Sequence, residues 1–346
     1  MPPPPDPRAA GATLDDLGEA GILDRVFARL RAGGPDVLVG PGDDTALVRV
    51  HGPVLATTDT MVRGRDWRDE WSSAADVGAK VVVQNLADLS AMGGLGTALL
   101  VTLVAPGSLP AAWAEQLTEG VSHAADAAGV PVVGGDLSSS PDAVVVSVTA
   151  LGVLPGPGPV LRSGAAPGQV FAVSEALGRS AAGLLLLQRS AAGEWPAPEL
   201  ADAAEHLVGY HCRPTPDLTQ GPVAAAAGAT ALIDVSDGLA RDAGRIASAS
   251  GVRIDLDDDA LGELARPLQL AVGAGAAREC VLSGGEEHVL LGTFPVGAVP
   301  RGWTVLGEVS APGERGPGVW CRDMDVGAGG WDHFGGPGAR TTKAGT

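Results

Sequence analysis

The chain has 346 residues, a length that predicts two domains, and 45% of them are hydrophobic, which is ample for packed cores. Its formal net charge is −18, so the backbone of a nucleic acid or an anionic membrane is a poor partner. No apolar run reaches the roughly 18 residues that a membrane-spanning helix needs. If the substrate carries phosphate, metal ions must offset the repulsion.

The cysteines and the N-terminus indicate a cytoplasmic protein. Cys212, Cys280 and Cys321 are scattered and odd in number, so they form neither a metal motif nor a disulfide framework. Residues 1–12, MPPPPDPRAAGA, lack the basic and apolar regions of a signal peptide and are predicted to be a disordered tail.

The first predicted helix covers residues 14–32. Thr13 or Asp15 would cap it, and Gly33-Gly34-Pro35 would end it. Residues 40–59 follow, and here we expect a β-hairpin, because the apolar runs 46–50 and 54–56 flank a Gly-Pro turn.

This hairpin would bring acids together, because the start of one antiparallel strand lies beside the end of the next. Hard oxygen ligands would then be available from Asp44, Thr57, Thr58 and Asp59, a set that suits Mg²⁺ or Ca²⁺. The alternative is a solvated acidic hairpin without a metal.

The next predicted helix covers residues 72–92, begins at Ser72 or Ser73, and is largely apolar. Asn85 and Asp88 are three residues apart and therefore share a face. A buried aspartate needs a partner, and a shared cation would supply one.

The rest of the first half alternates strands with one helix. The predictions are a strand at 97–105, a helix at 109–128, a strand at 130–133 that ends in Gly134-Gly135-Asp136, and a strand at 143–154. The glycine pair would let the backbone approach a ligand closely. The sequence PGPGP at 155–159 breaks the pattern and predicts the domain boundary.

The second half repeats these elements. The predicted strands are 170–173, 231–233, 252–256, 289–294 and 304–309, and the predicted helices are 180–189, 198–210, 217–227 and 239–249. Residues after Pro312 are expected to be loose, except near Trp331. Strands and helices are mixed without strict alternation, so the predicted fold class is α+β, built as sandwiches.

Acidic residues recur at strand ends or helix starts next to Gly, Ser or Thr. They are Asp43, Asp44, Asp59, Asp88, Asp136, Asp234, Asp237, Glu286 and Glu287. Any one of them, Asp237 for example, could be a simple helix cap. No P-loop, GxSxG or HExxH motif is present. The pattern therefore favours metal-assisted transfer between two polyanions.

Ordered motifs carry a family resemblance. GDDTA, TTDT, VQNLADLSAMG, VVGGD, LRSGAAPG, DVSDGL, LSGGEEH and GGWDHFG occur in the order seen in thiamine-monophosphate kinases, members of the aminoimidazole-ribotide synthetase-like superfamily. The resemblance runs from about residue 17 to 336. It implies a kinase that uses ATP and Mg²⁺ to convert thiamine monophosphate to thiamine diphosphate, with no protein nucleophile.

The resemblance also implies an oligomeric state and a separate role for each domain. Residues 13–155 would be an α/β domain that binds ATP and metal and pairs two subunits through its sheet. Residues 156–346 would be an α/β sandwich that closes the site. The protein would be a homodimer.

The motifs shared with the family also imply which residues of this sequence form the site. The implied metal ligands are Asp44, Thr57, Thr58, Asp59, Asp88, Asp136, Asp234 and Asp237. Gly135, Arg162 and Ser236 resemble nucleotide contacts, although Arg162 could instead form a linker salt bridge. Asp66, Glu286 and Trp331 occupy the positions of substrate contacts, with Trp331 stacking on the acceptor's ring. The alternative for Trp331 is a core side chain.

Two departures from the family keep other readings open. Asp66 stands where the family usually has histidine, and Glu287 stands where GGED has aspartate. Both departures affect the expected identity of the acceptor, and neither changes the ATP–metal site. A paralogue with a different acceptor, or a catalytically silent nucleotide- or metal-binding protein, therefore remains an alternative.

Overall fold

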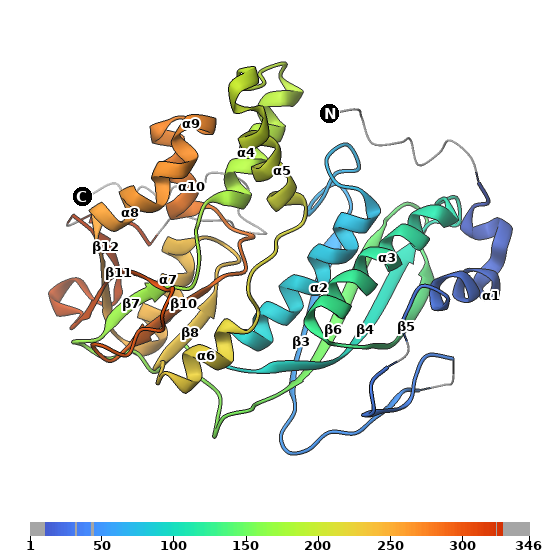
Figure 1. The fold of residues 1–346 in the computed structure, drawn as a ribbon, viewed down its shortest axis with the longest axis horizontal. Coiled ribbons are helices and arrows are strands. Elements are labelled where there is room, and N and C mark those ends of the chain that lie inside the picture. The colour runs from blue at the N-terminus through green and yellow to red at the C-terminus, as the bar shows by residue number, and fades with distance from the viewer. Residues whose placement is uncertain (1–10, 32, 43–44, 323, 328–346) are drawn as a thin grey trace, which may run out of the picture. The chain divides into compact units, whose positions relative to one another are not determined.

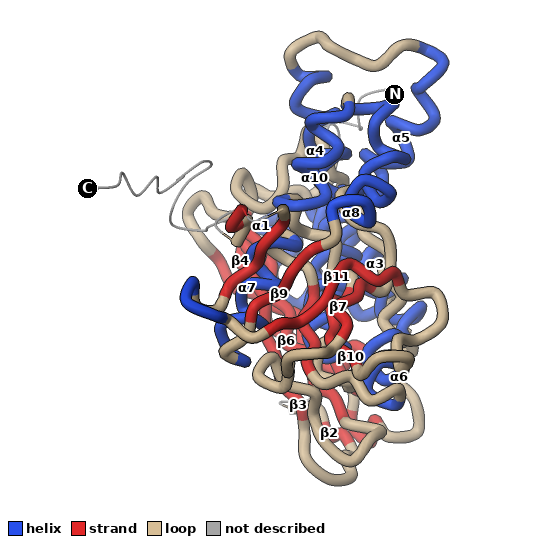
Figure 2. Tube along the Cα trace, turned by 90° about the vertical axis from the view of Figure 1, so that its left-hand side faces the viewer, coloured by secondary structure: helices blue, strands red, loops and turns tan. Residues whose placement is uncertain are grey.

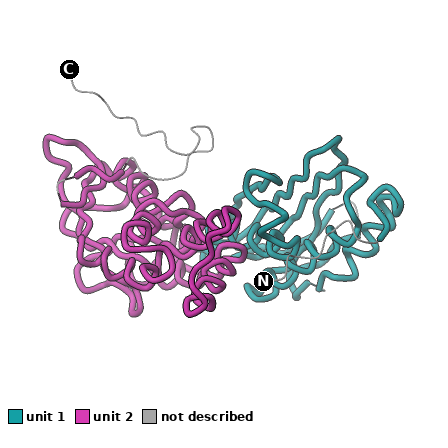
Figure 3. The backbone as a smooth tube through the Cα atoms, turned by 90° about the horizontal axis from the view of Figure 1, so that it is seen from above, with its two compact units in different colours: residues 1–89, 94–154 teal, residues 90–93, 155–346 magenta. Residues whose placement is uncertain are grey.

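The computed structural model describes residues 11–31, 33–42, 45–322 and 324–327. Its contacts divide the chain into two compact units, shown in Figure 3. Unit 1 contains residues up to Leu89 together with Gly94–Leu154, and unit 2 contains Ser90–Gly93 together with the chain from Pro155. In the described part of the chain, no helix has the length and apolar character needed to cross a membrane.

Unit 1 is built on a four-stranded sheet with the order β3-β6-β4-β5. The strands are β3 (Leu55–Val62), β4 (Leu95–Ala105), β5 (Val132–Ser139) and β6 (Val145–Val153). β6 pairs antiparallel with β3 and β4, whereas β4 and β5 are parallel. A parallel pair needs a crossover connection, and α3 (Ala111–Ala128) supplies it.

Helices α2 (Ala74–Ser90) and α3 lie on one face of this sheet (Figure 1). Alternate residues of β6, among them Val146, Val148 and Ala150, are buried beneath them. The two helices pack closely because glycines face the other helix. A Cβ on Gly78 would lie 2.1 Å from the Leu117 carbonyl oxygen, and one on Gly120 would lie 1.9 Å from that of Ala75.

Helix α1 (Leu14–Phe27) begins at a capping box, in which the Thr13 hydroxyl accepts from the Asp16 amide and the Asp16 carboxylate binds the Thr13 amide. It is shorter than the predicted span of 14–32, and Gly18, with a φ of 64°, kinks it. Arg25 of α1, and Arg29 just after its end, form ion pairs with Glu115 of α3.

The predicted hairpin at residues 46–56 is wrong. β2 (Leu47–Val48) pairs with β1 (Val37–Val39), and β3 pairs along its whole length with β6, from Leu55–Gly152 to Val62–Val145. The eight residues of β3 gain a full ladder with a strand some 90 positions away, and a local turn signal cannot compete with that. Asp43 and Asp44 lie outside the described residues.

Unit 2 is built on a seven-stranded sheet with the order β13-β12-β9-β11-β7-β10-β8. Figure 2 shows four of its strands, β9, β11, β7 and β10, side by side. The strands are β7 (Val170–Val173), β8 (Ala231–Asp234), β9 (Arg253–Leu256), β10 (Leu290–Phe294), β11 (Thr304–Ser310), β12 (Gly318–Cys321) and β13 (Met324–Asp325). Among the residues that the structure describes, the pair of β12 with β9 is the only parallel one in this sheet.

Both faces of this sheet are covered. Phe171 and Val173 of β7 belong to the larger core with the helices, whereas Ala172 between them belongs to a smaller core with Phe294 and Trp303. The helices are α4 (Arg179–Ala191), α5 (Ala201–Cys212), α6 (Gln220–Ala226), α7 (Leu239–Ser250), α8 (Asp258–Ala265), α9 (Gln269–Val272) and α10 (Ala274–Ser283).

Two further expectations are wrong. The strand predicted at 130–133 does not end in Gly134-Gly135-Asp136, because β5 begins at Val132 and continues through these residues to Ser139. The segment after Pro312 is not wholly loose, because β12 joins the sheet beside β9. Short alternating strands such as GVWC carry little local signal, and their partner decides their structure.

Candidate active site

In unit 1, β3 and α2 bring predicted ligands together. The Thr57 hydroxyl donates to Asp88 Oδ2 over 2.7 Å, and the Asp59 amide donates to Asn85 Oδ1 over 3.0 Å. Thr57 and Asp59 lie two residues apart on a strand and so share one face, while Asn85 and Asp88 lie three apart on a helix and share another. The result is a group of hard oxygen donors.

Thr58 and Asp136 are not part of that group. Thr58 lies on the opposite face of β3, where its hydroxyl donates to the Val148 carbonyl oxygen over 3.0 Å. Asp136 is exposed on β5, and the Ser138 hydroxyl donates to its Oδ2 over 2.6 Å. Gly135 allows β5 to lie close to β4, since a Cβ there would lie 1.8 Å from the Val101 carbonyl oxygen of β4.

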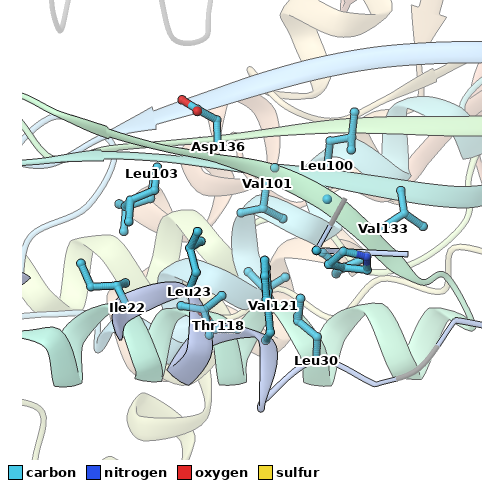
Figure 4. A pocket seen from close by; sticks show the side chains of 18 of the residues that line it. Ile22, Leu23, Leu30, Leu100, Val101, Leu103, Thr118, Val121, Val133 and Asp136 are labelled. Carbon is cyan, nitrogen blue, oxygen red and sulfur yellow. The ribbon is translucent and has the colours of Figure 1, made fainter. Parts of the chain in front are cut away.

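A cavity of about 650 Å³ lies between the sheet and helices α1 and α3 (Figure 4). Its walls are mostly apolar, with Ile22 and Leu23 from α1, Val121 from α3, and Leu103 from β4. Gly135 and Asp136 of β5 also belong to its lining, and Asp136 is labelled in Figure 4. Sequence reasoning missed this cavity, although its size is typical of sites that take a small molecule.

In unit 2, the loop after β8 is organised by Asp242, a residue that sequence reasoning missed. Its Oδ2 accepts the backbone N–H groups of Ser236, Asp237 and Gly238 over 2.9–3.1 Å. Burial, and then the nearby Asp234 carboxylate, raise the pKa of Asp242 to about 7. A fully buried carboxylate that binds three amides fixes the backbone of this loop.

Within the same loop, the two predicted metal ligands have protein partners. Asp234 Oδ2 lies 3.2 Å from His288 Nδ1, and Asp237 Oδ2 accepts from Arg245. The Ser236 carbonyl oxygen accepts the Glu286 amide over 2.8 Å. The loop therefore connects directly to residues 283–288.

Residues 283–288 point neighbouring glutamates in different directions. The Glu286 side chain is 37% exposed, whereas Glu287 is fully buried and accepts the Ser180 amide over 2.7 Å. Burial raises the pKa of Glu287 to about 7, against the opposing effect of Arg179. Glu287 thus faces the interior of unit 2.

The remaining predicted residues are separate. Asp66 Oδ2 accepts the Val62 amide over 2.7 Å within its own turn. Arg162 is exposed, and its carbonyl oxygen accepts from the Ser250 hydroxyl. Asp44 and Trp331 lie outside the described residues.

The donors of unit 1 suit a magnesium ion, although the residues described hold no cluster of three or more His, Cys, Asp or Glu placed to bind a metal. Mg²⁺ is commonly held by one or two carboxylates and completed by water and substrate phosphates. Asp88, with Thr57 beside it, is chemically compatible with that role.

Comparisons with known proteins identify the class. Residues 42–154 match the family model of the AIR synthase related protein, N-terminal domain. The predicted two-domain α+β fold is confirmed by solved structures. A thiamine-monophosphate kinase from Stenotrophomonas maltophilia K279a is 32% identical, with a TM-score of 0.75 over 89% of this chain and 98% of that one. AaThiL complexed with AMPPCP and TMP is 30% identical, with a TM-score of 0.68 over 93% and 98%.

Curated relatives identify the family. The thiamine-monophosphate kinase of Mycobacterium tuberculosis (strain ATCC 25618 / H37Rv) is 45% identical over 330 residues, which is 94% of each chain. That of Corynebacterium glutamicum is 38% identical over 88% of this chain and 90% of its own. The chain belongs to the thiamine-monophosphate kinase family.

Proposed function

We propose that this protein transfers the γ-phosphoryl group of ATP to thiamine monophosphate and releases thiamine diphosphate and ADP. The observation that carries the proposal is 45% identity over 94% of both chains to a thiamine-monophosphate kinase. AaThiL, a similar structure, is complexed with AMPPCP and TMP, and AMPPCP differs from ATP in the group that bridges its outer phosphates.

The proposed reaction is direct. An oxygen of the acceptor phosphate bonds to the γ-phosphorus, the bond from that phosphorus to the β,γ-bridging oxygen breaks, and ADP leaves. Since the acceptor phosphate is ionised near neutral pH, no strong general base is needed. Positioning and electrostatic stabilisation supply the acceleration in this chemistry.

We assign the metal to the oxygen donors around Asp88. Mg²⁺ held there would offset the charge of the phosphates. Asp88 accepts the Thr57 hydroxyl, which orients its carboxylate, and Asn85 holds the backbone of Asp59. The other predicted ligands, Asp44, Thr58, Asp136, Asp234 and Asp237, and the nucleotide contacts Gly135, Arg162 and Ser236, stay predictions.

Asp66 and Glu287 no longer favour a different acceptor. Both carboxylates bind backbone amides of the protein itself, at Val62 and Ser180. Glu286 and Trp331 stay the predicted acceptor contacts, and the predicted contact of Asp66 stays to be tested with the Asp66→Asn variant. The homodimer, the cytoplasmic location and the proposed roles of the two domains also stay predictions.

The test compares acceptors. Purified protein with ATP and Mg²⁺ receives thiamine monophosphate, unphosphorylated thiamine or no acceptor, and thiamine diphosphate and ADP are both quantified. We expect ADP and thiamine diphosphate in equal amounts with thiamine monophosphate alone. ADP formation that ignores thiamine monophosphate would replace this proposal with the paralogue alternative.

A further inference from the structure

The loop at residues 283–288 is held in a backbone conformation that its sequence does not favour. Glu286 and His288 have φ values of 58° and 57°, in the left-handed region that side-chain-bearing residues rarely adopt. Such residues persist only where the surroundings fix them. The amides of Glu287 and His288 both donate to the Val235 carbonyl oxygen, over 3.1 and 2.9 Å.

The side chain of Glu287 anchors this loop to a helix. It is fully buried, and its Oε1 accepts the Ser180 amide in the first turn of α4 over 2.7 Å. Amides in a first turn have no partner within the helix and carry partial positive charge, so a carboxylate is stabilised there. Oε2 lies 3.5 Å from Arg179 Nε, which balances the buried charge.

Tyr210 closes the network. The Arg179 guanidinium lies 3.9 Å from the centre of the Tyr210 ring, and its Nη2 donates to the Tyr210 hydroxyl over 2.7 Å. That hydroxyl donates to the Glu287 carbonyl oxygen over 3.2 Å. Glu287 is therefore held through its side chain and through its backbone by one connected group.

Glu286 lies directly beside this network. Its carboxylate is partly exposed, and its Oε2 lies 3.6 Å from Nδ1 of His211, the neighbour of Tyr210. His211 Nδ1 also lies 3.0 Å from the hydroxyl of Ser180, the residue whose amide binds Glu287. The start of α4 and the end of α5 therefore hold Glu287 and also lie beside Glu286.

We infer that Glu287, Arg179 and Tyr210 are positioning residues that aim Glu286 at the acceptor. The inference rests on the proposed function, in which Glu286 contacts thiamine monophosphate. Glu287 in this role acts through Glu286 and does not touch the acceptor itself.

The experiment separates positioning from general stability. The variants are Glu287→Gln, Tyr210→Phe, Glu286→Gln and the double variant Glu286→Gln/Glu287→Gln. The control is Glu263→Gln, whose exposed carboxylate pairs with Arg266 on the surface of α8. The KM for thiamine monophosphate, the KM for ATP, kcat and the melting temperature are measured for each.

Glu287→Gln removes the charge that faces Arg179, and Tyr210→Phe removes the hydroxyl that binds the Glu287 carbonyl oxygen. We expect each change to lower kcat/KM for thiamine monophosphate roughly 10- to 100-fold, because a displacement near 1 Å can have such an effect. The KM for ATP should stay within about twofold, and Glu263→Gln should match wild type. In the Glu286→Gln background, Glu287→Gln should add little, because it acts through the group already removed.

Three results would overturn the inference. Folded variants with unchanged kcat/KM for thiamine monophosphate would remove the positioning role. Equal changes in both KM values, or fully additive effects in the double variant, would show a general structural role. Tyr210→Phe, which removes one hydroxyl, keeps the test valid if Glu287→Gln does not fold. A wild type that forms no thiamine diphosphate would instead refute the proposed function, and the inference would fall with it.

Discussion

At the scale of single residues, contacts that are distant in sequence decide what each acid does. Asp88 receives the Thr57 hydroxyl from another element, whereas Asp66 is engaged within its own turn. Asp242 binds three amides and Glu287 binds one, both without access to solvent. Similar carboxylates therefore divide into candidate ligands and structural anchors.

Asp88→Asn should abolish most of the kinase activity. The change removes a negative oxygen from the proposed metal site while keeping the shape of the side chain. We expect kcat/KM for thiamine monophosphate to fall at least 100-fold, since even outer partners of a metal site contribute 10- to 100-fold. Asp142→Asn, exposed in the turn before β6, is the matched control and should retain wild-type activity. Comparable activity in the two variants would remove Asp88 from the site.

Asp66→Asn should leave the acceptor's KM within about threefold, because an amide oxygen can still accept the Val62 amide. Asp66→Ala removes that acceptor and should lower the free energy of unfolding by about 1–2 kcal/mol. Denaturant unfolding and initial rates together check both statements. A tenfold rise in KM with unchanged stability in Asp66→Asn would establish instead that Asp66 contacts the acceptor.

At the scale of elements, close helix packing in unit 1 depends on glycine. α2 carries the candidate ligand Asp88 and meets α3 where Gly78 faces the Leu117 carbonyl oxygen. No side chain fits between these backbones, so the separation of the helices fixes the position of α2 over β3.

Gly78→Ala should lower the free energy of unfolding by about 1–3 kcal/mol, because its Cβ would overlap the backbone of α3. Gly262→Ala is the control within α8, where nothing lies within 4 Å of the added Cβ. There, the higher helix propensity of alanine should stabilise the protein by roughly 0.5–1 kcal/mol. Equal effects of the two changes in chemical denaturation would contradict the packing account.

Much of the element pattern follows from local sequence. The helix expected at 72–92 is observed as α2, Ala74–Ser90, and the strand expected at 170–173 is observed as β7 with the same bounds. Apolar periodicity and caps were sufficient there. The hairpin failed because β3 takes its partner, β6, from far along the chain.

The candidate site was predictable only in part, for a physical reason. Thr57, Asp59 and Asp88 stand in short motifs that can be recognised from the sequence alone. Asp242, Arg179 and Tyr210 act through contacts with residues in other elements, which no local pattern reveals. The inward direction of Glu287 depends on left-handed backbone at its two neighbours, which tertiary hydrogen bonds impose.

At the scale of the whole molecule, the acidic composition agrees with a metal-dependent reaction between phosphates. A net charge of −18 disfavours two polyanions unless cations accompany them. Activity should therefore require a divalent cation. Removal of Mg²⁺ with a chelator should abolish thiamine diphosphate formation, and added Mg²⁺ should restore it. Full activity in excess chelator would contradict the assignment of a metal to Asp88.

The central claim is phosphoryl transfer from ATP directly to thiamine monophosphate, and the fate of the γ-phosphate tests it most directly. Purified protein is incubated with Mg²⁺, thiamine monophosphate and ATP labelled at the γ-phosphorus, and the labelled products are separated. We predict that the label appears in the terminal phosphate of thiamine diphosphate, with one ADP formed for each. Label found only in inorganic phosphate, with thiamine monophosphate unchanged, would contradict the account.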